Sequence, residues 1–322
     1  QYRPNEIPVF PEEEEVKIPE EGKILCDTSD IIAAHHTVFD EDQLMLGARG
    51  VPAMDILIKD GAQPPHAVNP RQMSPNLKEA LREELNHLRK SGIIRKMDTS
   101  EKIITTAPIV MVKKKDHTWR LCVDYRNLNK VIRPQPFPME NVQELLRRLQ
   151  GATIFAVLDL RKGFHQMSLT PESAALTAFT TPFGLFQYQR VPMGLITSPA
   201  FFQSVMSGLL GHLPNVAVYI DDVIIYGYNV KEFKETLNLV LQVMQDHQLT
   251  CKLQKCSIGV DRVQFLGHIV DGTKIRMSKS RIQGVTDLQR PTTIPELRTF
   301  LGVCNYFRRF VSNLSIIIKP LT

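Results

Sequence analysis

The sequence predicts an α+β fold with an antiparallel sheet at its centre. Short apolar runs joined by polar turns, which are typical of hairpins, mix irregularly with amphipathic helical segments. Neither an internal repeat nor the steady strand–helix alternation of a doubly wound parallel sheet is present in the sequence. With 322 residues, of which 43% are hydrophobic and 23% charged, the chain has ample material for a globular core.

Charge is distributed unevenly along the chain. Residues 1–60 contain 5 Lys or Arg against 14 Asp or Glu, whereas the remaining residues contain 34 against 20. The stretch PEEEEVKIPEE makes residues 1 to about 22 an acidic, proline-rich tether. The basic remainder of the chain favours a polyanionic partner, of which nucleic acid is the commonest.

Cysteine usage and hydropathy exclude several classes of protein. The five cysteines are too scattered for a disulfide framework, and none form a C-x-x-C pair, so no zinc site is expected. No apolar run approaches the ~20 residues of a membrane span, so no membrane partner is expected. His35 and His36, followed by Asp40, Glu41 and Asp42, favour a solvated loop, with a metal site as the alternative. An intracellular protein with reduced thiols is therefore expected.

The first part of the chain predicts a long helix and a basic hairpin. The helix over 74–91 begins with Ser74 at its N-cap and Pro75 in its first turn. Two apolar runs, 109–112 and 121–123, flank a polar turn and predict a hairpin that carries several Lys and Arg side chains.

Further strands, a hairpin and helices are predicted in irregular order through the rest of the chain. The predicted elements are a buried strand over 153–160, a hairpin within 166–197, helices over 198–210 and 230–247, short strands over 250–255 and 262–270, and a helix from 293 to about 311. A capping box, formed by Thr293 and Glu296, opens the last helix.

Carboxylates lie at the ends of two apolar runs. Asp159 is near the end of its predicted strand, and Asp221 and Asp222 interrupt the run VYIDDVIIY about sixty residues later. An Asp pair at a hairpin tip is commonly structural, because the short side chain bonds its own backbone. The alternative is that neighbouring strands bring three carboxylates to one rim of a sheet, where hard oxygen ligands select Mg²⁺. Two such ions would activate an attacking hydroxyl and neutralise a leaving pyrophosphate.

Six sequence blocks, in order, distinguish these alternatives. They are VKKKDHTWRLCVDYRNLNK, FAVLDLRKGFHQ, TAFTTPFGLFQYQRVPMGLITSPAFFQ, VYIDDVIIY, KCSIGVDRVQFLGHIV and TTIPELRTFLGVCNYFRRFV. Together they make the chain resemble the reverse transcriptase of gypsy-type LTR retrotransposons and, more distantly, retroviral reverse transcriptases. The resemblance covers roughly residues 37–322, which favours the metal-binding interpretation of the Asp pair.

The resemblance implies a right-hand polymerase architecture. Its parts would be fingers at 61–130 with 166–197, a palm at 131–165 with 198–272, and a thumb with the start of a connecting domain at 273–322. Residues 1–60 would be an acidic leader and N-terminal extension, either a linker from a preceding protease or the start of a free-standing protein. No second set of four carboxylates follows, so a ribonuclease H domain is not expected in this chain, and whether one acts in trans stays open.

The resemblance also implies roles for individual residues. Asp159, Asp221 and Asp222 would be the catalytic triad that binds two Mg²⁺ ions, with Mn²⁺ as a substitute. Tyr219 and Ile220 complete the Tyr-x-Asp-Asp signature. The other implied assignments are nucleotide binding by Lys114, Arg120, Phe164, Met193 and Gly194, a primer grip of Phe265, Leu266 and Gly267, and nucleic-acid binding by Tyr219, Ile220, Arg298, Arg308 and Arg309.

The implied activity is that of an RNA-directed DNA polymerase, which extends a primer on an RNA or DNA template with deoxynucleoside triphosphates. It would act in the cytoplasm, within a virus-like particle, or in the nucleus, with other products of the same polyprotein as partners. Lys162 departs from the family, which usually has Ser there, and adds charge beside the triphosphate site. The alternative function is a domesticated, non-catalytic descendant that binds RNA or a protein partner, because a fold alone does not fix activity.

Overall fold

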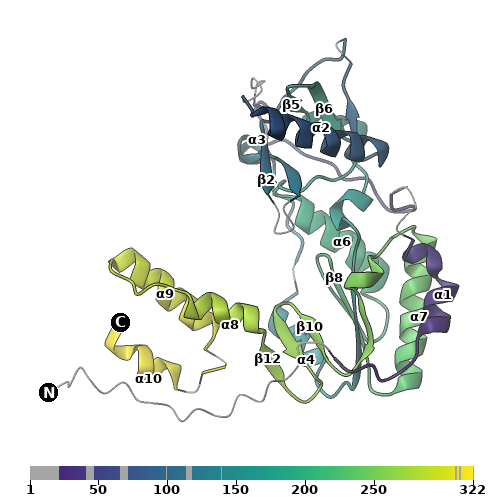
Figure 1. Ribbon diagram of the computed structural model, residues 1–322, viewed down its shortest axis with the longest axis vertical. Coiled ribbons are helices and arrows are strands. Elements are labelled where there is room, and N and C mark those ends of the chain that lie inside the picture. Colours follow the sequence, from purple (N-terminus) through teal and green to yellow (C-terminus); the bar gives the residue numbers. More distant parts are fainter. Residues whose placement is uncertain are drawn as a thin grey trace.

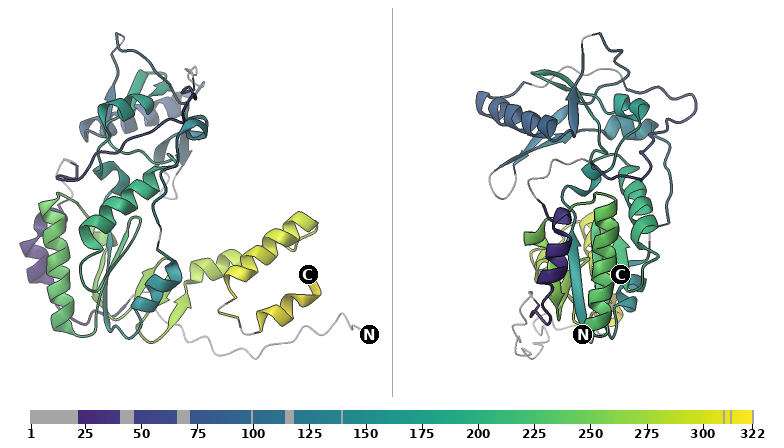
Figure 2. Two further views of the ribbon diagram at one scale, coloured as in Figure 1. Left: turned by 180° about the vertical axis from the view of Figure 1, so that it is seen from behind. Right: turned by 90° about the vertical axis from the view of Figure 1, so that its right-hand side faces the viewer.

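The computed structural model describes residues 22–40, 47–65, 72–98, 100–113, 118–138, 140–308, 310–311 and 313–321. Figure 1 shows three parts: a central layer of sheet and helices, an upper lobe, and a C-terminal arm formed by α8, α9 and α10. The left view of Figure 2 shows the arm leaving the base of the central layer, on the side away from α1 and α7.

The central layer contains a four-stranded antiparallel sheet in the order β7-β8-β4-β9. Its strands are β4 (Ile154–Asp159), β7 (Val216–Tyr219), β8 (Asp222–Gly227) and β9 (Ser257–Val260). Ile154, Ala156 and Leu158 join one hydrophobic cluster, whereas Phe155 joins a second cluster on the opposite face. Because side chains alternate across a strand, two covered faces require apolar residues at successive positions, which explains the continuous run IFAVL.

Helices cover one face of this sheet, and a helix with a small sheet covers the other. The first face packs against α6 (Ser198–Leu210) and α7 (Val230–Asp246), both at the predicted positions. Helix α7 buries one stripe of apolar side chains, namely Phe233, Leu237, Val240, Leu241 and Met244. The second face packs against α4 (Val142–Arg148) and the sheet β10-β11-β12.

The upper lobe has its own short strands and helices. They are α2 (Pro75–Lys90), β1 (Ile94–Lys96), β2 (Ile109–Lys113), β3 (Trp119–Val123), α3 (Arg126–Val131), α5 (Pro171–Leu176), β5 (Phe179–Thr181) and β6 (Gly184–Tyr188). The strands form a sheet in the order β1-β6-β5 and the separate hairpin β2-β3. The predicted first helix and basic hairpin are therefore confirmed, and α2 buries its leucines Leu81, Leu85 and Leu88 against the lobe.

The C-terminal arm follows the small sheet. The small sheet consists of β10 (Val263–Phe265), β11 (His268–Val270) and β12 (Ile275–Met277). The arm consists of α8 (Lys279–Thr286), α9 (Ile294–Tyr306), α10 (Leu314–Ile318) and a 3₁₀ turn (Lys319–Leu321). Thr293 and Glu296 form the predicted capping box at the start of α9. The helix ends at Tyr306, earlier than the predicted end near 311.

Residues 22–40 complete the central layer. Ile24 pairs with Val260 in an antiparallel bridge, and the Leu25 N–H donates to the Gly259 carbonyl at 2.7 Å. Helix α1 (Ser29–Ala34) then packs on the outer side of α7 (Figure 1). Apart from Gly22, the predicted acidic tether lies outside the described residues.

The prediction of a solvated loop is wrong for His35, which is buried. A 3₁₀ turn (His36–Val38) packs against α7 because Val38 and Phe39 enter the core, and this buries the neighbouring imidazole. The ring nitrogens of His35 lie 2.8 Å from Gln245 Oε1 and 3.0 Å from Asn238 Oδ1, so both nitrogens contact α7 amides.

Two predicted strands near the end of the central layer are also wrong. Within 250–255, Cys251 makes a single bridge to Leu160, and Leu253–Lys255 form a 3₁₀ turn (η3) before β9 begins. The apolar stretch 262–270 is divided into β10 and β11 by a two-residue turn. Leu266 and Gly267, with φ of 50° and 73°, make that turn, and the sequence pattern did not distinguish it from a longer strand.

None of the helices in the described part of the chain is both long enough and apolar enough to cross a membrane.

Candidate active site

The three predicted catalytic carboxylates lie at one end of the central sheet. Strands β7 and β8 form a hairpin in which Tyr219 faces Asp222, and Ile220 and Asp221 make the two-residue loop. Strand β8 also pairs with β4, with Asp222 directly opposite Asp159. Directly opposed residues on antiparallel strands have neighbouring side chains when they share a face. The fold therefore brings together acidic residues that are about sixty positions apart in the sequence.

Asp222 is the carboxylate most affected by this arrangement. Burial, together with the charges of Asp221 and Asp159, raises its pKa to about 6. Asp159 Oδ2 lies 3.8 Å from Lys255 Nζ, and both side chains are partly exposed. As the side chains stand, no three His, Cys, Asp or Glu residues of the described chain are close enough to ligate one ion. The mutual repulsion felt by Asp222 is nevertheless the kind that a bound cation relieves.

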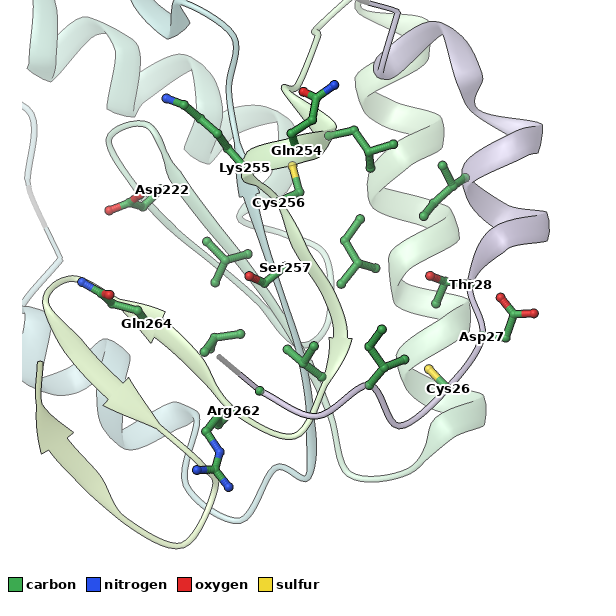
Figure 3. A pocket seen from close by; sticks show the side chains of 18 of the residues that line it. Cys26, Asp27, Thr28, Asp222, Gln254, Lys255, Cys256, Ser257, Arg262 and Gln264 are labelled. Atoms are coloured by element: carbon green, nitrogen blue, oxygen red, sulfur yellow. The ribbon is translucent and has the colours of Figure 1, made fainter. Parts of the chain in front are cut away.

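A large groove begins beside Asp222. Its volume is about 1080 Å³, and it runs between β9, the β10–β11 turn and the N-terminal segment (Figure 3). Figure 3 shows Asp222, Lys255 and Gln264 around one end of the groove, and Cys26 and Asp27 at the other. Charged and polar side chains, namely Asp222, Lys255 and Gln264, line this end of the groove (Figure 3), so it can accept a polar ligand.

The predicted primer-grip residues differ in their accessibility. Leu266 and Gly267 line the groove beside Asp222. Phe265 is only 1% exposed and packs in the cluster beneath the sheet, so its side chain supports the turn from inside. An added Cβ at Gly267 would lie 2.0 Å from Arg281 Nε, so this side chain of α8 closely approaches the turn.

A smaller cavity lies between the upper lobe and the central layer. Its volume is about 240 Å³, and three residues predicted to bind nucleotide line it: Arg120, Met193 and Gly194. Lys162 lines the same cavity and contacts His87 of α2, with 2.8 Å between Nζ and Nε2. The fold therefore places Arg120, Met193 and Gly194, three of the residues predicted to bind nucleotide, around one cavity. Lys114, another predicted nucleotide-binding residue, lies outside the described residues.

Phe164 lies in the 3₁₀ turn Gly163–Gln166 (η2), which follows β4. Its ring contacts Phe202 of α6 edge-on, with 5.1 Å between the ring centroids, and the side chain is half-buried. An added Cβ at Gly163 would lie 3.6 Å from the Cβ of Asp221, so this turn lies directly against the carboxylate loop. The predicted role of Phe164 in sugar selection stays a prediction.

The described members of the predicted nucleic-acid-binding set lie in three places. Tyr219 and Arg308 line one cavity of about 800 Å³ between α4, the small sheet and the arm. Ile220 lies in the carboxylate loop, and Arg298 is exposed on α9. Arg309 lies outside the described residues.

Gln203 and Lys255 are two residues near the carboxylates to which the sequence analysis gave no role. Gln203 is 1% exposed on α6 and bonds the backbone of the β7–β8 hairpin. A Gln within the apolar helix SPAFFQSVM was a detectable signal, because buried amides need partners. Lys255 gave no such signal, since only the three-dimensional fold brings its Nζ to Asp159.

The class that the fold defines is the α+β polymerase fold, and the three carboxylates lie at one end of its central sheet. Residues 112–270 match the family described as "Reverse transcriptase (RNA-dependent DNA polymerase)". These residues of the chain belong to this reverse transcriptase family, and the resemblance to retrotransposon and retroviral enzymes is confirmed.

Similar polyproteins come from transposons. The chain is 36% identical over 219 residues to the Retrovirus-related Pol polyprotein from transposon 297 of Drosophila melanogaster. The aligned region covers 66% of this chain and 21% of the relative. It is 33% identical over 251 residues to the Transposon Tf2-3 polyprotein of Schizosaccharomyces pombe, covering 77% of this chain and 18% of the relative. The chain thus spans about a fifth of the length of these relatives.

Similar solved structures are viral. The foamy viral protease-reverse transcriptase in complex with RNA/DNA hybrid has a TM-score of 0.77 and 26% identity, over 93% of this chain and 40% of that one. The same kind of protein in complex with dsDNA has a TM-score of 0.80 and 26% identity, over 93% of this chain and 63% of that one. The predicted α+β polymerase fold is confirmed by these similarities.

Proposed function

We propose that this protein is an RNA-directed DNA polymerase, which extends a primer on an RNA or DNA template with deoxynucleoside triphosphates. The observation that carries the proposal is the register that sets Asp222 opposite Asp159, with Asp221 in the adjoining loop. Three carboxylates at one sheet rim, with Asp222 lining a large groove, suit phosphoryl transfer better than a structural role. A separate cavity that contains Arg120 and Lys162 supports the same interpretation.

Asp159, Asp221 and Asp222 are the residues that would hold two Mg²⁺ ions, and reverse transcriptases generally use divalent metals. The fit rests on their hard oxygen donors and on the raised pKa of Asp222, which reflects carboxylates that repel one another. Bound metal would supply charge stabilisation and activation of the primer hydroxyl. Before metal binds, Lys255 lies close enough to Asp159 to offset part of the local negative charge.

The cavity at the upper lobe would bind the incoming nucleotide. Arg120 provides a guanidinium that can bond phosphate oxygens in a fork, and Lys162 adds a second positive charge in the same cavity. Met193 and Gly194 line the cavity opposite, where a base or sugar would lie. Phe164 would lie beneath the ribose and exclude a 2′-hydroxyl by a steric clash.

The template–primer would bind along the groove beside Asp222 and against the arm. Leu266 and Gly267 would contact the primer end, and Arg308 would contact phosphates from the cavity that it shares with Tyr219. The foamy viral proteins with bound RNA/DNA hybrid and dsDNA support a duplex as the ligand. In this proposal the upper lobe is the fingers, the central layer is the palm and the arm is the thumb, with the boundaries given in the sequence analysis.

Primer extension on a defined RNA template tests the proposal directly. The purified chain should extend a labelled DNA primer with deoxynucleotides, and chelation of divalent metal should stop the reaction. A protein that binds the template–primer but adds no nucleotide would instead be the non-catalytic descendant.

Salt dependence tests the proposed binding surface separately. Affinity for the duplex should fall log-linearly with salt, because Lys and Arg side chains release counterions from the phosphates. Arg308→Ala should weaken binding and reduce the magnitude of the slope by roughly 1. Lys319→Ala, at the far end of the arm and exposed, is the matched control. Affinity that does not respond to salt would contradict the phosphate-binding surface.

A further inference from the structure

The carboxylate loop adopts a backbone conformation that its own sequence does not favour. Ile220, the first residue of the two-residue loop, has φ of +56°. Positive φ at this position of a tight hairpin favours glycine, and a β-branched residue there is a genuine outlier. The loop therefore needs support from outside the hairpin.

Gln203 of α6 supplies that support through both ends of its side-chain amide. Its Oε1 accepts a hydrogen bond from the Ile220 N–H at 2.5 Å, and its Nε2 donates to the Val218 carbonyl at 3.0 Å. These two backbone groups lie on either side of Tyr219, at the end of β7. A neutral amide combines the acceptor and the donor that these two bonds need, whereas a carboxylate lacks the donor and an apolar side chain lacks both.

Helix α6 is also in contact with the other carboxylate-bearing element. Phe202, the residue before Gln203, packs edge-on against Phe164 in the turn that follows β4. An added Cβ at Gly163 in that turn would lie 3.3 Å from Phe202 Cζ. One rigid helix thus contacts both the Asp221–Asp222 loop and the turn beyond Asp159.

We propose that Gln203 is a positioning residue that holds the β7–β8 loop in its positive-φ conformation and so fixes Asp221 and Asp222 relative to Asp159. The catalytic consequence of this inference rests on the proposed polymerase function, but the effect on the loop does not. Removing a group that hydrogen-bonds to a metal-binding element, and so orients its ligands, commonly lowers metal affinity or activity about 10- to 100-fold.

The chain provides a matched control on the same helix. Gln203 Nε2 also donates to Ser207 Oγ at 2.9 Å, and this bond has no contact with the hairpin. Gln203→Met keeps the length of the side chain but removes both bonds to the loop. Gln203→Glu keeps the acceptor for Ile220 and removes the donor for Val218. Ser207→Ala removes only the third bond.

Amide hydrogen exchange tests the loop itself, without metal, nucleic acid or activity. In the metal-free protein the Ile220 amide should be protected, and Gln203→Met should accelerate its exchange at least about tenfold. Ser207→Ala should leave the exchange unchanged. Exchange rates that are equal in wild type and in a folded Gln203→Met variant would overturn the proposal. If that variant does not fold, Gln203→Asn decides in its place through loss of protection at the same amide, because its side chain is one methylene shorter and cannot span both bonds to the hairpin. Gln203→Glu should keep most of the protection of Ile220, because it keeps the acceptor.

Kinetics then test the consequence for the site. In Gln203→Met the half-saturating Mg²⁺ concentration should rise and kcat should fall by about 10- to 100-fold, while KM for the nucleotide and Kd for the template–primer change less than about twofold. If Gln203 only packed in the core, its loss should change kcat, the Mg²⁺ requirement, KM and Kd by similar factors. A parallel change in all four would therefore count against positioning.

A double variant provides the final test. Ile220→Gly removes the conformational penalty of positive φ. Adding Gln203→Met to the Ile220→Gly variant should therefore lower kcat by a clearly smaller factor than Gln203→Met does in wild type. Equal losses in both backgrounds would overturn the proposed mechanism. If wild type extends no primer, the polymerase proposal fails, and the hydrogen-exchange result still decides whether Gln203 holds the loop.

Discussion

The carboxylate-bearing sheet and the C-terminal arm are built in opposite ways. Val223, Ile224 and Ile225 of β8 are completely buried, and covered faces surround them on both sides. On the arm, Ile294 is 69% exposed and Ile316 is 71% exposed, and no described residue of α9 is buried. The sheet is held by its own core, whereas the arm presents most of its surface to its surroundings.

This difference matches the demands that the proposed polymerase function would place on the two regions. Phosphoryl transfer needs its charged groups within fractions of an ångström, and residues locked by packing provide that precision. A surface that follows a long, flexible polyanion gains more from exposure and positive charge than from a rigid core. The two regions should therefore respond differently to substitution, and four comparisons can test this.

The largest effect is expected at the carboxylates. Asp221→Asn keeps the side-chain volume but removes a charge proposed to hold metal, and metal-centred stabilisation is worth several kcal/mol, so the extension rate should fall at least about 10³-fold. Because Asp221 is exposed at the loop, unfolding temperature should hardly change. Extension at the wild-type rate by a folded Asn variant would contradict the assignment of the triad.

A matched pair of isoleucines compares the stability of the two regions. Ile225→Ala in β8 should lower the free energy of unfolding by about 2–5 kcal/mol, because it opens a cavity in a close-packed core. The same change at Ile316 of the arm should cost less than about 0.5 kcal/mol, since that side chain is exposed. Urea unfolding measures both values, and equal losses would mean that the arm has a core of its own.

Selection between ribonucleotides and deoxynucleotides tests whether Phe164, which packs next to the sheet, also contacts the nucleotide. Phe164→Val removes a ring held against Phe202 and should raise the ratio of ribonucleotide to deoxynucleotide kcat/KM by about 10- to 100-fold. Deoxynucleotide incorporation itself should fall much less. An unchanged ratio would assign Phe164 to the core and leave the selective group elsewhere.

The smallest expected effect is a dependence of stability on pH. The pKa of Asp222 in the folded protein, about 6, exceeds its ordinary value of 3.8, because of burial and repulsion from Asp221 and Asp159. Its contribution to stability is therefore fully present below pH 3.8 and is lost as pH rises through about 6. Metal-free Asp222→Asn should melt about 1–3 °C above wild type at pH 7.5, and the difference should vanish near pH 4. A difference that is independent of pH would contradict this origin.

Sequence patterns predicted those elements whose signals are local. Helices α2 and α7 bury apolar stripes that are visible within their own sequences, and α7 is also capped by Asn229. Six blocks in order indicated the reverse transcriptase family. The proximity of Asp159 and Asp222 was predicted from strand ends and the resemblance, and the register confirms that these two residues are adjacent.

Contacts between distant segments could not be predicted in this way. Strand β9 joins the sheet beside a register shift at Phe155 and Ala156, which depends on the partner strand and not on the sequence of β9. The burial of His35 depends on amides of α7 more than two hundred residues away. The two bonds from Gln203 to the hairpin likewise become visible only when α6 lies against β7.

The bridge between Ile24 and Val260 has a practical consequence for handling the protein. Strand β9 is the edge of the central sheet, and the N-terminal segment pairs with that edge. An uncovered edge strand is a template for pairing with a second molecule. A version of the chain shortened to begin at residue 47 would leave β9 and the outer side of α7 uncovered, and should therefore self-associate in size-exclusion chromatography at concentrations where the full chain does not.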